Sequence, residues 1–386
     1  MFWISAGQRR SIGLLRCWSL TVSPRGVTTS RCPQLHLRSL FSSAPVSSRH
    51  EEAKPSPLRQ WALTVSPFTT VKAHLGCNIS IRSLDPHAYP EADRAFITVH
   101  GPDSEDVCRD HIHVHYDEQS KELLISAESV NSDVSIEMDA PIKCDLLIAA
   151  SGKGSVQVKK MECDICKVQT EQGSCLLHSV KGHQIEVQSN GGHVTGVGTI
   201  HGNVHIRAKG DSEVNVKKLQ GTEMNVSTER GPLKVKAIYA ESSCVSSCSG
   251  RIELGNVHGN TIVENVSGDT VIDGSNSFLK VSSDSGGIDV YVGDGGTAAL
   301  HSQDGVVSVR VPSSLRAALE LSGASVDVSS EVVLHEVERN TTDGYTTLTG
   351  YMNGESPAGQ SVKAQADRGA VRLRTQSWFD SLKLGS

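Results

Sequence analysis

Residues 202–221 read Gly202-Asn-Val-His-Ile-Arg-Ala-Lys-Gly210-Asp-Ser-Glu-Val-Asn-Val-Lys-Lys-Leu-Gln-Gly221, and this stretch decides the fold. A glycine recurs at intervals of 8 and 11 residues, and apolar and polar residues alternate between the glycines. Alternation with a period of two is typical of a β-strand with one buried face. The stretch therefore predicts short strands of about five residues, each ended by a turn.

The same pattern extends well beyond the quoted residues. The glycines that carry it are Gly173, Gly182, Gly191, Gly202, Gly210, Gly221, Gly231, Gly250, Gly259, Gly268, Gly287 and Gly305. Strands repeated at so regular a spacing favour a β-solenoid, in which successive coils stack, and a β-sandwich is the alternative. We therefore expect an all-β protein containing a repeat β-solenoid of about fifteen short strands. Such a core is structural, and the glycines themselves carry no chemistry.

The composition agrees with many short strands and turns. The chain has 386 residues with 35 glycines and only 4% aromatic residues, which argues against a helical bundle. The sequence contains no run of 18 apolar residues, so we expect no transmembrane helix. The eight cysteines after residue 50 follow no framework of a small secreted protein, which indicates a reducing compartment.

The first fifty residues differ from the rest of the chain. They contain seven arginines and no acidic residue, a composition typical of a mitochondrial transit peptide. We expect its removal between Arg38 and Arg49 and a location in the mitochondrial matrix. The remaining chain has 30 basic and 43 acidic residues, a net charge of −13. Nucleic acid needs clustered cations for binding, so it is not an expected partner.

The organisation predicted along the chain has five parts. They are a transit peptide (residues 1–50), a linker (51–57), an N-terminal β-rich domain (58–150), the glycine-periodic solenoid (151–312) and a C-terminal cap (313–386) with a loose loop at 340–360. Within the N-terminal part, Tyr116 to Leu123 reads as a hairpin turn between two strands. Within the cap, Ser313 to Glu320 has the pattern of one or two helical turns begun by a serine cap.

One strand of the N-terminal part carries three histidines. His111, His113 and His115 share one strand face because alternate residues point to the same side. Imidazoles at this spacing can bind zinc or copper. Ile112 and Val114 form the apolar face, so a solvated outer face with three histidines is the preferred interpretation.

A second candidate site is the CxxC motif formed by Cys163 and Cys166. Zinc sites pair such a motif with a second one or with nearby histidines, and a redox motif begins a helix. This motif stands alone and lies among predicted strands, so buried free thiols are the preferred interpretation. Cys175 follows Cys166 by about one step of the glycine repeat, and we expect the two thiols to stack.

The sequence contains no recognisable catalytic motif of the common enzyme classes. The chain has no G-x-S-x-G, no H-E-x-x-H and no phosphate-binding loop. Some β-helices hydrolyse polysaccharides with acidic groups gathered on one face. Here Asp269, Asp273, Asp284 and Asp289 follow no common spacing, and aromatic platforms for sugars are scarce. We expect no enzyme, no catalytic residue and no cofactor.

A set of apolar residues and glycines before the repeat resembles a known family. These residues are Pro141, Leu146, Ile148, Gly152, Gly154, Val156 and Val158, followed by coils such as Gly202–Ile206. Together they resemble an adhesin-like family of repeat β-solenoids that is widespread in bacteria. The resemblance spans about residues 140–312; it implies the solenoid fold and transfers no site residue.

These observations favour a non-catalytic mitochondrial protein that binds an unknown protein partner as a scaffold. Peripheral contact with the inner membrane stays open. Two alternatives also stay open: a metal- or thiol-dependent protein that uses the histidine strand or the CxxC motif, and a carbohydrate- or surface-binding module like the bacterial relatives.

Overall fold

The computed structural model describes residues 57–101, 111–127, 133–354 and 359–376. Residues 54–386 form one compact unit, and its described part consists of strands joined by turns. The predicted all-β fold is therefore confirmed. Within the described ranges, no helix is long and apolar enough to span a membrane. The predicted transit peptide lies outside the described residues.

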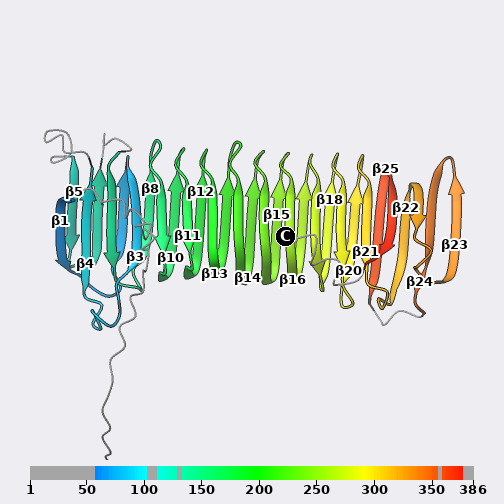
Figure 1. The fold of residues 1–386 in the computed structure, drawn as a ribbon, viewed down its shortest axis with the longest axis horizontal. Coiled ribbons are helices and arrows are strands. Elements are labelled where there is room, and N and C mark those ends of the chain that lie inside the picture. Colours follow the sequence, from blue (N-terminus) through cyan, green and yellow to red (C-terminus); the bar gives the residue numbers. More distant parts are fainter. Residues whose placement is uncertain (1–56, 102–110, 128–132, 355–358, 377–386) are drawn as a thin grey trace, which may run out of the picture. The chain divides into compact units, whose positions relative to one another are not determined.

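The solenoid is built from stacked coils that lie side by side in Figure 1. Its strands are β8 (Asp145–Ala150), β9 (Val156–Lys159), β10 (Glu162–Thr170), β11 (Cys175–His178), β12 (Lys181–Ser189), β13 (Val194–Ala208), β14 (Val214–Thr228), β15 (Leu233–Ser247), β16 (Ile252–Asn265), β17 (Thr270–Ser275), β18 (Phe278–Ser283), β19 (Ile288–Val292), β20 (Thr297–Ser302) and β21 (Val307–Val311). Each coil crosses two layers of parallel strands. Layer 1 contains β9, β11, the first residues of β13–β16, β17, β19 and β21, and layer 2 contains the other strands and the last residues of β13–β16.

The repeat unit is a full coil of about 19 residues. In layer 1, Val194 pairs with Val214, Val214 with Leu233, and Leu233 with Ile252. The predicted step of 9 or 10 residues is therefore half a coil. The strands β13–β16 have 14 or 15 residues, longer than the predicted five, because the backbone stays paired with its neighbours while it bends from one layer into the other.

The core runs continuously between the two layers. Inward side chains such as Val214, Leu219 and Val226 are at most 1% exposed and lie in rows with the equivalent residues of the next coil. Burying one such side chain contributes roughly 1.5–3 kcal/mol. Because each coil buries its apolar residues against its neighbours, the stability of a coil depends on the coils beside it.

The periodic glycines stack in two columns at opposite edges of the coils. A Cβ atom on Gly192 would lie 1.9 Å from the carbonyl oxygen of Gly173, and one on Gly202 would lie 1.8 Å from that of Gly182. These backbones approach too closely for any side chain. One of these edges joins layer 2 to layer 1 and is called the turn edge. At two of its turns the glycine in close contact differs from the predicted one: it is Gly192 instead of Gly191, and Gly286 instead of Gly287.

A row of small polar residues lines the inside of the turn edge. Its members are Thr170, Ser189, Thr228, Ser247, Asn265, Ser283 and Ser302, joined by strand pairing through Ala208. The Ser283 hydroxyl accepts a hydrogen bond from the backbone N–H of Gly286 (2.9 Å), and Ser302 does the same for Gly305 (2.8 Å). These bonds satisfy backbone donors at the turns that follow Ser283 and Ser302.

At the N-terminal end the coils do not follow the chain order. The strands are β1 (Pro57–Thr64), β2 (Thr70–Leu75), β3 (Asn78–Ser83), β4 (Arg94–His100), β5 (Ile112–Asp117), β6 (Glu122–Ala127) and β7 (Ser135–Ala140). The coil of β2 and β3 lies between the coil of β6 and β7 and that of β8 and β9. Parallel pairing therefore continues across residue 150. Antiparallel strands then close this end: β4 on β7, β1 on β4, and β5 on β6 through the predicted hairpin.

The C-terminal end repeats this arrangement with β22 (Ala317–Val328), β23 (Leu334–Thr342), β24 (Tyr345–Met352) and β25 (Ser361–Thr375). The last strand, β25, lies between the coil of β20 and β21 and strand β22, and β24 and β23 follow as antiparallel strands. Two local predictions were wrong. The predicted helical turns give way to β22 because Leu319 and Leu321 alternate as buried residues, and the predicted loop contains β24, whose pairing with β22 overrides its polar sequence.

Candidate interaction surface

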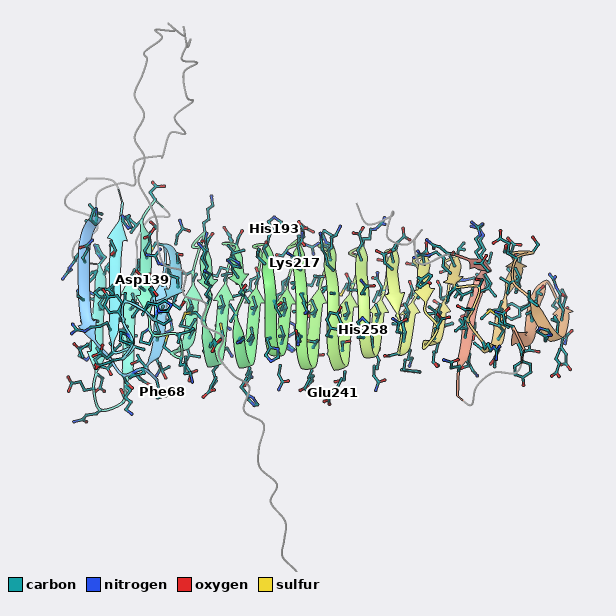
Figure 2. All side chains as sticks on the ribbon, turned by 60° about the horizontal axis from the view of Figure 1, so that its bottom comes forward. Phe68, Asp139, His193, Lys217, Glu241 and His258 are labelled. Atoms are coloured by element: carbon teal, nitrogen blue, oxygen red, sulfur yellow. The ribbon has the colours of Figure 1, made fainter. Side chains whose placement is uncertain are left out.

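The outward side chains of both layers form rows along the coils (Figure 2). Residues one coil apart face each other, and several pairs carry opposite charges: Lys167 and Glu186 (3.0 Å), Lys234 and Glu253 (3.1 Å), and Lys181 and Glu162 (2.8 Å). Such exposed pairs add at most about 1 kcal/mol each. The rows of outward side chains therefore form a regular, hydrated surface in which equivalent positions repeat at the strand spacing of about 4.8 Å.

The two edges of the coils carry different side chains. In Figure 2, His193 of the turn edge and Glu241 of the opposite edge, called the corner edge, project in opposite directions. On the corner edge the rings of Tyr239 and His258 stack with centroids 4.6 Å apart, and the Lys218 ammonium lies 4.9 Å from the Tyr239 centroid. Both faces of Tyr239 are therefore partly covered, and the ring is no open platform for a sugar.

The three predicted histidines are exposed. His113 and His115 lie on the outer face of β5, His111 immediately precedes this strand, and Ile112 is 3% exposed on the other face. Across the ranges that the structure describes, no group of three His, Cys, Asp or Glu side chains is placed to hold a metal ion. The preferred interpretation of a solvated strand face agrees with this geometry.

The CxxC pair lies inside the solenoid. Cys163 and Cys166 of β10 are buried free thiols, and the Cys163 Sγ lies 3.8 Å from the carbonyl oxygen of Lys181. The hydrogen bond with Cys163 and burial both raise the pKa of Cys166 well above the ordinary value. Burial likewise raises the pKa of Cys175 to about 12. The thiolate is the form that binds metals and attacks disulfides, so the raised pKa favours the less reactive thiol form of Cys166 and Cys175.

Cys166 and Cys175 do not stack on each other. Cys166 pairs in layer 2 with Leu146 and Ile185, whereas Cys175 pairs in layer 1 with Val156 and Val194. The prediction was wrong because one glycine step is half a coil and leads to the opposite layer.

Two of the four aspartates considered at the sequence level share one partner. The Arg310 side chain is 11% exposed and its guanidinium lies 2.7 Å from Asp289 and 3.8 Å from Asp273. Burial raises the pKa of Asp273, and Arg310 opposes this shift. Arg310 also donates to Gln376 and to the Ile272 carbonyl oxygen. These bonds use the guanidinium as a structural tie between coils, a role that the aspartate spacing did not reveal.

Within the part of the chain that the structure describes, hollows interrupt the outward rows, and two of them have similar volumes. One, of about 410 Å³, is lined by Ser243, Cys244, Ile262 and Phe278, among others. Ile262 and Phe278 are 40% and 42% exposed, so this hollow is largely apolar at its rim.

The other hollow, called the Ala149 hollow, also has about 410 Å³ and lies near the N-terminal end of layer 2. Ala149 forms its floor, between His74 of β2 and Gln169 of β10. Thr170 and Glu171 line it toward the turn edge. Sequence reasoning missed both hollows, because each depends on which coils become neighbours.

The chain is similar to a protein family and to several solved structures. Residues 177–374 match the family model described as Toastrack DUF4097, a range that begins later than the predicted resemblance and includes most of the C-terminal cap. The chain is similar to a candidate adhesin from Parabacteroides merdae, with 16% identity, a TM-score of 0.41, and coverage of 67% of this chain and 97% of that one. It is also similar to a candidate adhesin from Bacteroides fragilis (13% identity, TM-score 0.24, 82% and 96% coverage). A candidate lipid-binding protein from Parabacteroides distasonis shares 11% identity (TM-score 0.26, 84% and 98% coverage).

Proposed function

Because the chain belongs to the Toastrack DUF4097 family, with residues 177–374 matching it, we propose that the protein is a non-catalytic scaffold that binds a protein partner on the outward side of its coils. The observation that carries this proposal is that inward and outward side chains of the same strands have different roles. Inward residues form one continuous core, and outward residues of parallel strands form rows at a constant spacing. Solenoids commonly use such extended surfaces for binding.

The Ala149 hollow marks the part of this surface that we assign to the partner. It combines a recessed floor with polar groups that converge on it, which is the usual construction of a binding site. Elsewhere in the outward rows, exposed charged side chains pair with each other, as in Lys167 with Glu186 and Lys234 with Glu253. We therefore place the centre of the partner interface on layer 2 around β8 and β10.

The proposed location is the mitochondrial matrix. Its support is the composition of residues 1–50, which have seven arginines and no acidic residue. Import into isolated mitochondria followed by protease protection tests this location. We expect the full chain to be trimmed and protected, and a chain without residues 1–50 to stay outside. Protection of both forms would contradict the role of this segment.

Proximity labelling from the imported protein tests the scaffold. We expect the full chain to label a small set of proteins, and an Ala149→Leu variant, which fills the hollow from its floor, to lose part of that set. An unchanged set would move the interface away from the hollow, and labelling no stronger than that of an unrelated matrix protein would contradict the scaffold function.

A further inference from the structure

The Ala149 hollow exists because a small side chain stands in a row of large ones. Strand pairing places His74, Ala149, Gln169 and Gln188 next to one another in this order on the outer face of layer 2. With strands about 4.8 Å apart, the side chains of His74 and Gln169 flank a gap of about two strand spacings. The floor of this gap is a methyl group, so a ligand group can descend close to the backbone.

The rim of the hollow offers hydrogen-bond acceptors. One carboxylate oxygen of Glu171 accepts a hydrogen bond from the backbone N–H of Gly152 (2.7 Å), which fixes the carboxylate and leaves its other oxygen available. Across the described ranges, Glu171 has no ion-pair partner within 4.0 Å. The Gln169 amide N–H donates to the carbonyl oxygen of Gln188 (3.0 Å), so the carbonyl oxygen of Gln169 is the end of that side chain that can accept.

A buried hydroxyl beside the hollow also lacks a partner. Thr170 lines the hollow and is 2% exposed, and its Oγ1 makes no hydrogen bond. Within the described part of the same inner row, the other hydroxyls are bonded; Ser189, for example, accepts from the N–H of Gly192 (3.0 Å). A buried hydroxyl without a partner costs about 1–3 kcal/mol. Because Thr170 belongs to this inner row and alternates with the outward Gln169, its hydroxyl faces the core and is out of reach of a ligand in the hollow.

The charge of the hollow selects among ligands. Among the residues that the structure describes, its lining contains the carboxylate of Glu171 and no lysine or arginine, and residues 51–386 carry a net charge of −13. The described lining also has no Phe, Tyr or Trp ring on which a sugar could stack. A guanidinium supplies five donors in a planar fork and no acceptor, which complements a carboxylate and an amide carbonyl.

From this geometry we propose that the Ala149 hollow binds the guanidinium of an arginine side chain in a basic segment of the protein partner. Glu171 pairs with the charge, and the carbonyl oxygen of Gln169 accepts a further N–H group. This inference rests on the proposed scaffold function and names the chemistry of the partner.

The probe is a fluorescein-labelled tri-arginine peptide, measured by fluorescence anisotropy at low salt with the protein that lacks residues 1–50. Glu171→Gln is compared with Glu229→Gln, a matched control whose carboxylate accepts from the Gly210 N–H (2.8 Å) at an equivalent turn away from the hollow. We expect Glu171→Gln and Ala149→Leu to weaken binding about 10-fold or more, and Glu229→Gln to leave it within about 2-fold, because a charge-assisted hydrogen bond is lost only in the hollow.

Three further comparisons decide the chemistry. A tri-citrulline peptide, which keeps the shape without the charge, is expected to bind about 10-fold more weakly. Thr170→Val, which changes only the core side of the same strand, is expected to leave tri-arginine affinity within about 2-fold and the circular dichroism spectrum unchanged. Equal weakening by Glu171→Gln and Glu229→Gln would mean that the peptide is attracted by the overall negative charge of the protein, and it would contradict the proposed site. Displacement of the probe by an uncharged trisaccharide would also contradict it. If the peptide does not bind but proximity labelling still depends on Ala149, the guanidinium assignment fails and the scaffold function stands.

Discussion

Replacing Gly286 by alanine tests whether backbone contact at the turn edge holds the coils together. A Cβ on Gly286 would lie 1.8 Å from the carbonyl oxygen of Gly268 in the coil below. Its neighbour Gly287 is the matched control, because the nearest atom to a Cβ there is a carboxylate oxygen of Asp269 at 3.1 Å, which belongs to a mobile side-chain end. Neither glycine has the positive φ that an alanine would strain, so the comparison isolates the contact.

The expected magnitude follows from the displacement. An ordinary Cβ···O contact is about 3.4 Å, so Gly286→Ala must separate the two coils by about 1.6 Å at this edge. Bonds at risk between these two coils join the Thr270 N–H to the Gly287 carbonyl (2.8 Å) and the Ser285 N–H to the Val266 carbonyl (3.0 Å). Two or three such losses, some leaving buried groups unpaired, cost about 3–5 kcal/mol. For Gly287→Ala we expect a change within about 1 kcal/mol, since alanine also restricts the unfolded chain.

The assay is thermal unfolding followed by circular dichroism, combined with hydrogen exchange because a solenoid can open locally. At about 2 °C per kcal/mol for a unit of this size, Gly286→Ala should lower the midpoint by about 6–10 °C. Faster exchange should concentrate in residues 265–310. Equal midpoints for the two variants, or loosening spread evenly over the unit, would refute the reasoning.

Three other predictions follow from the same structure. Thr170→Val should stabilise the unliganded protein by about 1 kcal/mol in thermal unfolding, because it removes a buried hydroxyl without a partner; destabilisation would mean that the hydroxyl is satisfied. Native alkylation read by mass spectrometry should modify exposed Cys248 first and leave Cys144, Cys166 and Cys175 untouched until unfolding, because burial raises the pKa of these thiols; early loss of Cys166 would contradict the closed core. Arg310→Leu should cost about 1–3 kcal/mol at pH 7. Burial raises the pKa of Asp273 and Arg310 lowers it, so without Arg310 the ionised carboxylate opposes folding more strongly. The difference in unfolding free energy between Arg310→Leu and the unchanged protein should therefore shrink as the pH falls toward 4 and the carboxylate becomes protonated. A difference that does not depend on pH would exclude this electrostatic account.

Local regularities of the sequence predicted the strand content well. The alternation Val214-Asn-Val216 buries both valines and exposes the asparagine, as strand geometry requires. The glycine spacing also placed the edges of the coils. The spacing did not distinguish Gly286 from Gly287, because both precede the same strand. Only the position of Gly268 in the preceding coil decides which of the two contacts its carbonyl oxygen.

By itself, the sequence determined an all-β repeat with turns at regular intervals, since alternation and turn chemistry act within a few residues of the chain. Only the tertiary structure decided that β2 and β3 lie beside β8 and β9, and that β25 enters before β22. The Ala149 hollow belongs to this second class, because its walls come from His74 and Gln169, which are 95 residues apart in the sequence. Strand register over such separations is set by the packing of whole coils, and no local pattern encodes it.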